Sequence, residues 1–281
     1  MRTLAREDIR WFLFWLGGLA VLGTWDAFFL NRPAFVLVQT AFVHTLLGCF
    51  VVVIVSLAAG WLAGTTLYFL ETRHRALYLL LTFGLNIIRS IPQIVGALTG
   101  YVILTILIAQ EILRDTISQL LWMSLVISLF LLPEVVDLVR ERIGYYSKRD
   151  FVPAMLCCGI SEGRIINRDI LWKNSRAHLL HKLISIFGVT IFLLCSIDFI
   201  ISVGLSTDVS LSNFPMTLGG LLAKMDSKQD ILAIGTVVTS MRNFDSLFFE
   251  HLQGISTAFL IVFTLLCIYK ISNGFVRRHR L

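Results

Sequence analysis

The sequence predicts an all-α membrane protein with six transmembrane helices. Hydrophobic residues make up 57% of the 281 residues and charged residues only 15%, whereas soluble domains carry about 25% charged residues. The apolar residues form long runs, and about 20 such residues cross a bilayer as a helix. A β-barrel would instead show segments of about ten residues with alternating hydrophobicity. A soluble enzyme, a disordered chain and a disulfide-stapled secreted domain are therefore excluded.

Six apolar segments are expected to form the transmembrane helices. Before the first of them, Glu7 and Asp8 stand among basic residues and no small-residue cleavage site follows, so we expect an uncleaved span there. Residues 1–281 are therefore expected to form a single transmembrane domain. The approximate bounds of the six segments are 11–30, 38–69, 76–110, 117–139, 183–204 and 256–275.

The third segment is too long for one perpendicular crossing of the membrane. Ser90, Ile91 and Pro92 lie in its middle, and a proline inside a helix removes one backbone hydrogen bond and bends the helix. We therefore expect 76–90 to enter obliquely along the membrane interface and 92–110 to make the crossing.

The distribution of Lys and Arg predicts the orientation of the bundle. Of the 24 such residues, 18 lie on segments that share a side with the N-terminus and five lie on the other side. Because cytoplasmic segments carry an excess of positive charge, both termini are expected in the cytoplasm. The formal charge of +6 is this orientation signal, so we expect membrane lipid as the surroundings and no nucleic-acid partner.

Two long connections follow from this topology, a cytoplasmic one over 140–182 and an external one over 205–255. The external connection is expected to hold one or more short helices over the outer mouth of the bundle. Its clusters at 221–222, 231–232 and 244–249 are apolar and need burial, and long structureless loops are uncommon in compact folds.

Arg89 lies inside an apolar run, where a lone arginine costs roughly 3 kcal/mol or more and so needs a partner or water. Three interpretations are open for it. Arg89 reaches the inner headgroups, it contacts an anionic substrate, or it forms an ion pair that locks an inner gate just after an expected kink at Pro133. Pro92 is expected on the same translocation path or gate. Glu134 and Asp137 are the expected partners of that ion pair, and Asp198 is excluded because it lies in the opposite half of the membrane.

Asp198 and Asp26 are two further acidic residues within apolar runs. Asp198 is expected either to line the translocation path or to be paired or exposed at the outer interface, and Asp26 is expected to be solvated near that interface. His44 is expected to be a hydrogen-bonded core residue. His178 and His181 are expected to have interfacial or packing roles, because two histidines without a nearby Cys or carboxylate make a weak metal site.

Small residues indicate close packing of helices. Gly60 and Gly64 form one pair four residues apart, and Gly96 and Gly100 form another. Such pairs let helices approach closely, either within this chain or against a partner subunit. The five cysteines form no Cys-x-x-Cys pair and no disulfide framework, so we expect free thiols.

The middle of the cytoplasmic connection predicts a helix, a tight turn and a second helix. Asp150 is expected to cap the first helix, and Pro153 suits its opening turn. Gly159 suits the left-handed conformation that ends this helix, and Ser161 with Glu162 suits the start of the next one. A short amphipathic helix held between two spans is suited to docking into a groove of another protein.

This segment resembles the coupling loop in permease subunits of binding-protein-dependent type I ABC importers, and in particular the C subunit of the dipeptide, oligopeptide and nickel group. That loop has the form Glu-Ala-Ala, three residues, Gly, and about ten residues to Ile-Leu-Pro. The similar residues here are 153–155, Gly159 and 170–172, and further similarities in collinear order are 90–92, 132–133, 138–140 and 218–223. Pro153 stands where the family has glutamate and Trp172 where it has the final proline, and the external stretch before the second span is absent.

The resemblance implies a transport subunit without enzymatic activity or a cofactor of its own. No Gly-x-x-x-x-Gly-Lys-Ser/Thr phosphate loop occurs, so ATP and Mg²⁺ are expected on two separate ATPase subunits. The other partners that the resemblance implies are a second homologous permease and an extracytoplasmic solute-binding protein, in the bacterial cytoplasmic membrane. The substrate stays open among a peptide, nickel, an opine or another small solute.

Because Pro153 replaces the acid of the family, the surface toward the ATPase is expected to be more apolar, led by Phe151, Met155 and Leu156. Two other classes of function stay open, namely an ATP-independent secondary transporter or channel and a scaffold subunit that does not transport. The full set of residues expected to contact the ATPase is Phe151, Val152, Pro153, Ala154, Met155, Leu156, Gly159, Ile160, Ser161 and Glu162.

Overall fold

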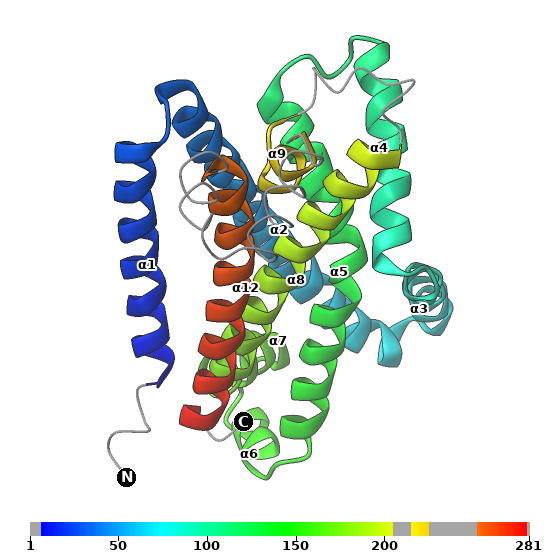
Figure 1. The fold of residues 1–281 in the computed structure, drawn as a ribbon. Coiled ribbons are helices and arrows are strands. Elements are labelled where there is room, and N and C mark those ends of the chain that lie inside the picture. The colour runs from blue at the N-terminus through cyan, green and yellow to red at the C-terminus, as the bar shows by residue number, and fades with distance from the viewer. Residues whose placement is uncertain (1–6, 205–214, 225–251, 280–281) are drawn as a thin grey trace.

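Long helices lie side by side in a bundle, and short helices lie at its two ends (Figure 1). The computed structural model describes residues 7–204, 215–224 and 252–279, and every regular element in these ranges is helical. The all-α prediction is therefore confirmed for that part of the chain. The elements are α1 (Glu7–Phe29), α2 (Arg32–Arg73), α3 (Arg75–Ser90), α4 (Gln93–Ala109), α5 (Thr116–Ser147), α6 (Phe151–Cys157), α7 (Glu162–Arg164), the π-helix η2 (Ile165–Asn174), α8 (Arg176–Gly204), α9 (Leu218–Lys224) and α12 (Leu252–His279).

Among the described residues, five helices are long and apolar enough to cross a bilayer, and a bent pair of helices brings the number to six if it forms one span. The five are the single helices α1, α2, α5, α8 and α12, and the pair is α3 and α4, which is bent by 92°. Each predicted apolar segment thus corresponds to one unit with the length and composition of a membrane span.

The bend between α3 and α4 lies at Ile91 and Pro92, as predicted. Ile91 has an extended backbone with φ −90° and ψ 122°, which is the conformation that a following proline favours. α3 buries no residue within the chain, whereas α4 buries Gly96, Ala97 and Leu104 among others. α3 therefore lies at the edge of the bundle (Figure 1), and α4 is the part that packs into it.

Several helices extend beyond the apolar segments that predicted them. α2 has 42 residues, which span about 63 Å, roughly twice the hydrocarbon core of a bilayer. α5 continues past 139 to Ser147, and α8 begins at Arg176 instead of 183. The cytoplasmic loop predicted over 140–182 is therefore largely helical, because polar residues continue a helix into water as readily as apolar ones continue it through lipid.

Both glycine pairs pack against α5 within the same chain. A methyl group at Gly60 would lie 2.5 Å from the Val135 side chain, and one at Gly100 would lie 2.2 Å from the Val126 side chain. Only glycine lets α2 and α4 approach α5 this closely. Of the two alternatives, packing within the chain is thus the one observed. The four contacts pair Gly60 with Val135, Gly64 with Val139, Gly96 with Phe130 and Gly100 with Val126.

The start of α1 and the end of α12 lie at one end of the bundle, together with α6 (Figure 1). Two ion pairs join them there: Glu7 with Arg277, at 3.1 Å between the charged atoms, and Asp8 with Arg278, at 3.0 Å. We call this the terminal end. The other end, which carries α9, is called the opposite end. An arrangement with six crossings brings both chain ends to one side in this way.

α9 is a short helix within the connection predicted to cover the outer mouth. It lies between α8 and α2, with Leu218 and Leu221 buried. A short helix at this position is therefore as predicted. The other apolar clusters predicted there, 231–232 and 244–249, lie outside the described residues.

Candidate functional site

α6 ends in a glycine motif at the terminal end of the bundle. Gly159 has φ +77°, a left-handed conformation that a side chain would strain. The Gly159 N–H donates to the Leu156 carbonyl at 2.9 Å, and the Ile160 N–H donates to the Met155 carbonyl at 3.1 Å. These two bonds are the Schellman arrangement that terminates helices. The predicted helix and its glycine stop are confirmed.

The side-chain caps predicted for this segment are wrong. Asp150 precedes α6 with a helical backbone (φ −58°, ψ −25°), and its side chain makes no cap hydrogen bond. The Val152 N–H donates to the Arg149 carbonyl at 3.0 Å, so the turn from α5 runs directly into α6 and leaves Asp150 without the extended backbone that a cap needs. Ser161 has an extended backbone but likewise makes no side-chain cap bond.

α6 divides its side chains between the core of this chain and the surface. Phe151, Val152 and Met155 are partly buried against the core, whereas Leu156 is 46% exposed. Two of the three side chains expected to lead the surface toward the ATPase, Phe151 and Met155, therefore lie partly against the chain's own core, and the contact with an ATPase stays a prediction. The exposed residues, called the α6 face below, are Pro153, Ala154, Leu156 and Cys157.

The segment after α6 is fixed to the long helices α2 and α5. Four apolar side chains of η2 are buried, namely Ile165, Ile166, Ile170 and Leu171. Three hydrogen bonds are added to these contacts: Trp61 Nε1 to Asn167 Oδ1 at 2.7 Å, Tyr68 OH to Glu162 Oε1 at 3.1 Å, and Tyr146 OH to the Asn174 carbonyl at 3.3 Å. A displacement of this segment therefore has to move α2, α5 or both.

Asp169 is the acidic residue of η2. Its Oδ1 accepts a hydrogen bond from Lys173 Nζ at 2.6 Å. This hydrogen bond, together with the positive charges of Lys173, Arg168 and Arg164, holds the pKa of the Asp169 carboxyl below its usual value. The pair ties one turn of the π-helix to the next.

A polar cluster lies midway along α5. Asp137 accepts a hydrogen bond from Arg89 at the end of α3. One turn earlier, Glu134 pairs with Lys182 of α8 at 2.6 Å and accepts a hydrogen bond from Gln93 Nε2 of α4 at 2.9 Å. These five residues, called the gate cluster below, join α3, α4, α5 and α8 around the bend.

The gate cluster contains the ion pair that was one of three alternatives for Arg89, with Asp137 and not Glu134 as the partner. Pro92 lies at the bend beside it, and its carbonyl accepts the Gly96 N–H at 3.0 Å. Lys182 was missed by sequence reasoning. Its position immediately before the fifth apolar segment, which the predicted topology places on the same side of the membrane as Glu134, was the signal that could have found it.

Asp198 lies at the opposite end and is buried. It accepts a hydrogen bond from Thr217, on the segment that leads into α9. Asp198, Tyr101 and His44 line a small cavity of about 20 Å³, which is room for about one water molecule. The His44 Nδ1 donates to the Met216 carbonyl at 3.0 Å, so His44 is hydrogen-bonded as predicted. Asp198 thus faces an internal cavity and not an exposed interface.

Two further expectations concern polar side chains near the helix ends. Asp26 was expected to be solvated, but it is buried and accepts a hydrogen bond from Ser256 Oγ at 2.6 Å. The prediction of a solvated Asp26 is therefore wrong, because α12 covers this side chain.

His178 Nε2 lies 2.8 Å from an Arg142 guanidinium nitrogen and accepts its hydrogen bond. In the described ranges no three potential metal ligands gather.

Comparison of the sequence with protein-family models gives no match, and comparison with curated proteins gives none either. The functional assignment therefore rests on α6, on the gate cluster and on the contacts that join them.

Proposed function

We propose that the protein is a permease subunit of an ATP-driven ABC importer in the bacterial cytoplasmic membrane. The observation that carries the proposal is α6, a seven-residue helix that projects from the terminal end between α5 and α8 and stops at Gly159. Its free face is small and apolar, as a helix that docks into a groove of a partner requires. In this proposal the partner is one of two ATPase subunits, which bind ATP and Mg²⁺ and supply the energy.

The anchoring of the loop favours a role in transmitting force. If the docking helix were on a flexible loop, its displacement by the partner would not be transmitted to the transmembrane helices. Here Trp61 holds Asn167 and Tyr68 holds Glu162, so the loop is tied to the end of α2, while buried η2 side chains rest against α5. A rigid-body movement of α6 is therefore passed to the helices that pack most closely in the bundle.

The gate cluster lies along the same path. α5 carries Glu134 and Asp137 and continues directly to α6. A shift of α5 changes the distances from Asp137 to Arg89 and from Glu134 to Lys182, and these pairs set the angle between α3, α4 and α8. We infer that the cluster is intact in one state of the transporter and is broken in the other.

Two observations support a second permease subunit in this proposal: charged side chains exposed on the bundle, and an internal cavity too small for a solute. The Arg89 and Asp137 side chains are 37% and 57% exposed in this chain, and charged groups within apolar segments require a partner or a water-filled path. The cavity beside Asp198 holds about one water, too little for a peptide. The translocation path is therefore assigned to the interface with a second, homologous permease, fed by a solute-binding protein.

The proposal is tested by purifying the protein with its native partners through a tag on this chain. We expect ATPase subunits to copurify, and we expect ATP-dependent solute uptake in liposomes to be lost when residues 151–163 are deleted. Leu156→Glu places a charge on the α6 face and is expected to release the ATPase. Ile112→Glu is the matched control, because Ile112 is 62% exposed at the opposite end.

The alternatives predict other results. Uptake by the chain alone in liposomes without ATP would identify a secondary transporter or channel. A complex whose uptake is unchanged by the deletion would identify a scaffold subunit.

A further inference from the structure

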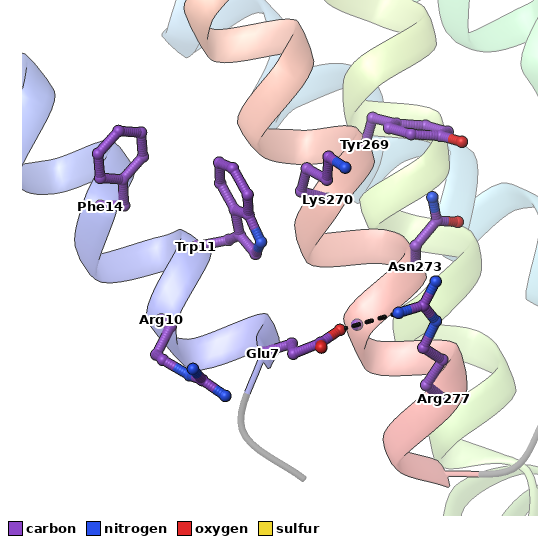
Figure 2. Close-up of a pocket in the computed structure, with 9 residues that line it drawn as sticks. Glu7, Arg10, Trp11, Phe14, Tyr269, Lys270, Asn273 and Arg277 are labelled. Atoms are coloured by element: carbon purple, nitrogen blue, oxygen red, sulfur yellow. Dashed lines mark hydrogen bonds and ion pairs between the residues drawn. The ribbon is translucent and has the colours of Figure 1, made fainter. Parts of the chain in front are cut away.

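Several acidic side chains that are partly or fully withdrawn from water face a cation of the same chain. At the terminal end Glu7 points toward Arg277, with 3.1 Å between the charged atoms (Figure 2). In η2 the buried Asp169 pairs with Lys173 at 2.6 Å. Such pairs are expected, because an uncompensated carboxylate is costly to remove from water.

Asp198 is buried without a pair of this kind. Its side chain is 9% exposed and accepts a hydrogen bond from the Thr217 hydroxyl. The ion pairs found among residues 7–204, 215–224 and 252–279 do not include Asp198. A hydroxyl is neutral, so its hydrogen bond leaves the negative charge of the carboxylate uncompensated.

The Asp198 carboxyl lines a small cavity between α2, α4, α5 and α8. The cavity has a volume of about 20 Å³, which is room for one particle of the size of a water molecule. No lysine or arginine lines it. Its polar side chains are those of His44, Tyr101, Asp198 and Thr217, and its apolar wall is formed by Gly48, Leu104, Leu120, Met123, Leu194 and Pro215.

The hydrogen-bond donors of Thr217 and His44 are already engaged. The Thr217 hydroxyl donates to Asp198, and the His44 Nδ1 donates to the Met216 carbonyl at 3.0 Å. A neutral imidazole with its proton on Nδ1 has a lone pair on Nε2. The groups that remain around the cavity are therefore a carboxylate and lone pairs, and Tyr101 adds a neutral hydroxyl. These groups match an occupant that is positively charged.

We propose that this cavity binds one dehydrated monovalent cation with about the radius of a water molecule, namely potassium or ammonium. The Asp198 carboxylate compensates the charge, and Thr217 Oγ1 and His44 Nε2 contribute lone pairs. A calcium or magnesium ion is a poorer match, because it requires six or more oxygen ligands. The site lies apart from α6 and from the gate cluster, so it does not depend on the proposed transport function.

A cation at this position holds α9 in place at the opposite end. Thr217 directly precedes α9, whose first N–H, that of Leu218, donates to Thr45 Oγ1 at 3.0 Å. A methyl group at Gly219 would lie 2.5 Å from the Cys195 backbone, so α9 is seated closely on α8. Loss of the cation leaves Asp198 uncompensated beside this contact and is expected to lower the stability of the protein.

The test measures binding of radioactive rubidium, a stand-in for potassium, to the full chain in detergent. Ionic strength is held constant with N-methyl-D-glucamine, which is too large for the cavity. We expect one saturable site per chain, from which potassium and ammonium displace rubidium and N-methyl-D-glucamine does not. The better competitor of the two identifies the preferred cation.

Two matched variants locate the site. Asp198→Asn is expected to lower the rubidium affinity at least about tenfold, because it removes the carboxylate charge of the site. Asp26→Asn is the control and is expected to bind like the wild type, since Asp26 is another buried carboxylate with one hydroxyl donor, Ser256, but does not line the cavity. In the wild type, potassium at 100 times its Kd should raise the Tm by about 5 °C, and Asp198→Asn should lose this shift.

A third variant changes the volume of the cavity without changing any charge. Gly48→Ala adds a methyl group next to Leu120 and Leu194, with no contact shorter than 3.3 Å, and is expected to weaken rubidium binding. It decides the matter if Asp198→Asn does not elute as a folded protein. The proposal is overturned if the wild type has no saturable site, if Asp198→Asn binds like the wild type, or if Gly48→Ala does so when Asp198→Asn cannot be measured.

Discussion

α5 and α1 are both long apolar helices, yet the bundle holds them in opposite ways. α5 buries twelve residues, most of them apolar, and receives the four glycine contacts of α2 and α4. α1 buries only Asp8 and Asp26, which lie near its two ends. Contacts with several helices thus fix the central helix, whereas the peripheral one is held mainly along a single seam with α12, by polar contacts and by the close approach of Phe263 to Gly18.

Under the proposed function, α5 is the helix that transmits movement, whereas α1 lies at the periphery of the bundle. α5 connects the α6 face to the gate cluster as one continuous helix with twelve buried residues. α1 is joined to α12 through Asp8 with Arg278 at one end and Asp26 with Ser256 at the other. Between these two points Trp15 Nε1 donates to Thr264 Oγ1 at 3.2 Å, and the Phe263 ring packs directly against Gly18.

The largest effect is expected for a methyl group in the α2–α5 contact. Gly60→Ala places a carbon 2.5 Å from Val135, and such overpacking costs about 1–3 kcal/mol. Gly17→Ala on α1 is the matched control, because nothing lies within 4 Å of its added carbon and the alanine stabilises the helix by up to about 1 kcal/mol. The free energy of unfolding in mixed micelles measures both. Equal effects of the two variants would remove the distinction between α5 and α1.

A smaller effect is expected at the end of α1 that carries Asp26. Ser256→Ala leaves the buried Asp26 carboxyl without the hydroxyl that donates to it at 2.6 Å, and the net loss of such a hydrogen bond costs about 0.5–1.5 kcal/mol. Thr24→Ala is the control, since Thr24 is exposed and donates only to the Val21 carbonyl of its own helix. A Ser256→Ala protein as stable as the control would show that α1 is not held at this point.

The gate cluster is expected to matter little for stability and more for transport. The Arg89–Asp137 pair is partly exposed, so Arg89→Ala should change the free energy of unfolding by less than about 1 kcal/mol. Uptake by the assembled transporter is expected to fall in this variant and to be partly restored by Arg89→Asp combined with Asp137→Arg. Unchanged uptake in Arg89→Ala would exclude the pair as a gate.

The smallest effect is a pH dependence in η2. Because the pKa of Asp169 is lowered from 3.8 in the folded protein, its pairing with Lys173 contributes stability above pH 3.8 and loses that contribution as the pH falls through the lowered folded value. Asp169→Asn should therefore be less stable than the wild type at pH 7, and the difference should shrink below pH 3.8. A difference that stays constant down to pH 3 would contradict the assignment.

The sequence predicts those features that a residue imposes on its own stretch of backbone. The bend at Ile91 and Pro92 follows from the proline, and the stop of α6 follows from Gly159, because each residue constrains its own backbone. The glycine pairs likewise indicate close packing. That they meet α5 depends on which helices become neighbours, and no local pattern specifies this.

The predictions that were wrong or missing concern features that depend on neighbouring helices or that leave only a weak pattern in the sequence. Asp26 was expected to be solvated, but α12 covers it and supplies Ser256 as a hydrogen-bond donor. Hydropathy located the apolar part of α5, whereas its polar extension to Ser147 carries no hydropathy signal. The π-helix at Ile165–Asn174 was predicted as an ordinary helix, because a shift from i+4 to i+5 hydrogen bonding has no distinct residue pattern.

The central claim is that the α6 face contacts an ATPase subunit, and thiol cross-linking tests it most directly. Cys157 and Cys158 are exposed at the end of α6, whereas Cys49, Cys195 and Cys267 are buried, so a short thiol-reactive cross-linker acts on α6 alone. We predict that in native membranes it joins this chain to an ATPase, and that Cys157→Ser/Cys158→Ser abolishes the product. A cross-linker that reaches only lipid or water there, in a complex that still imports its solute with ATP, would contradict the account.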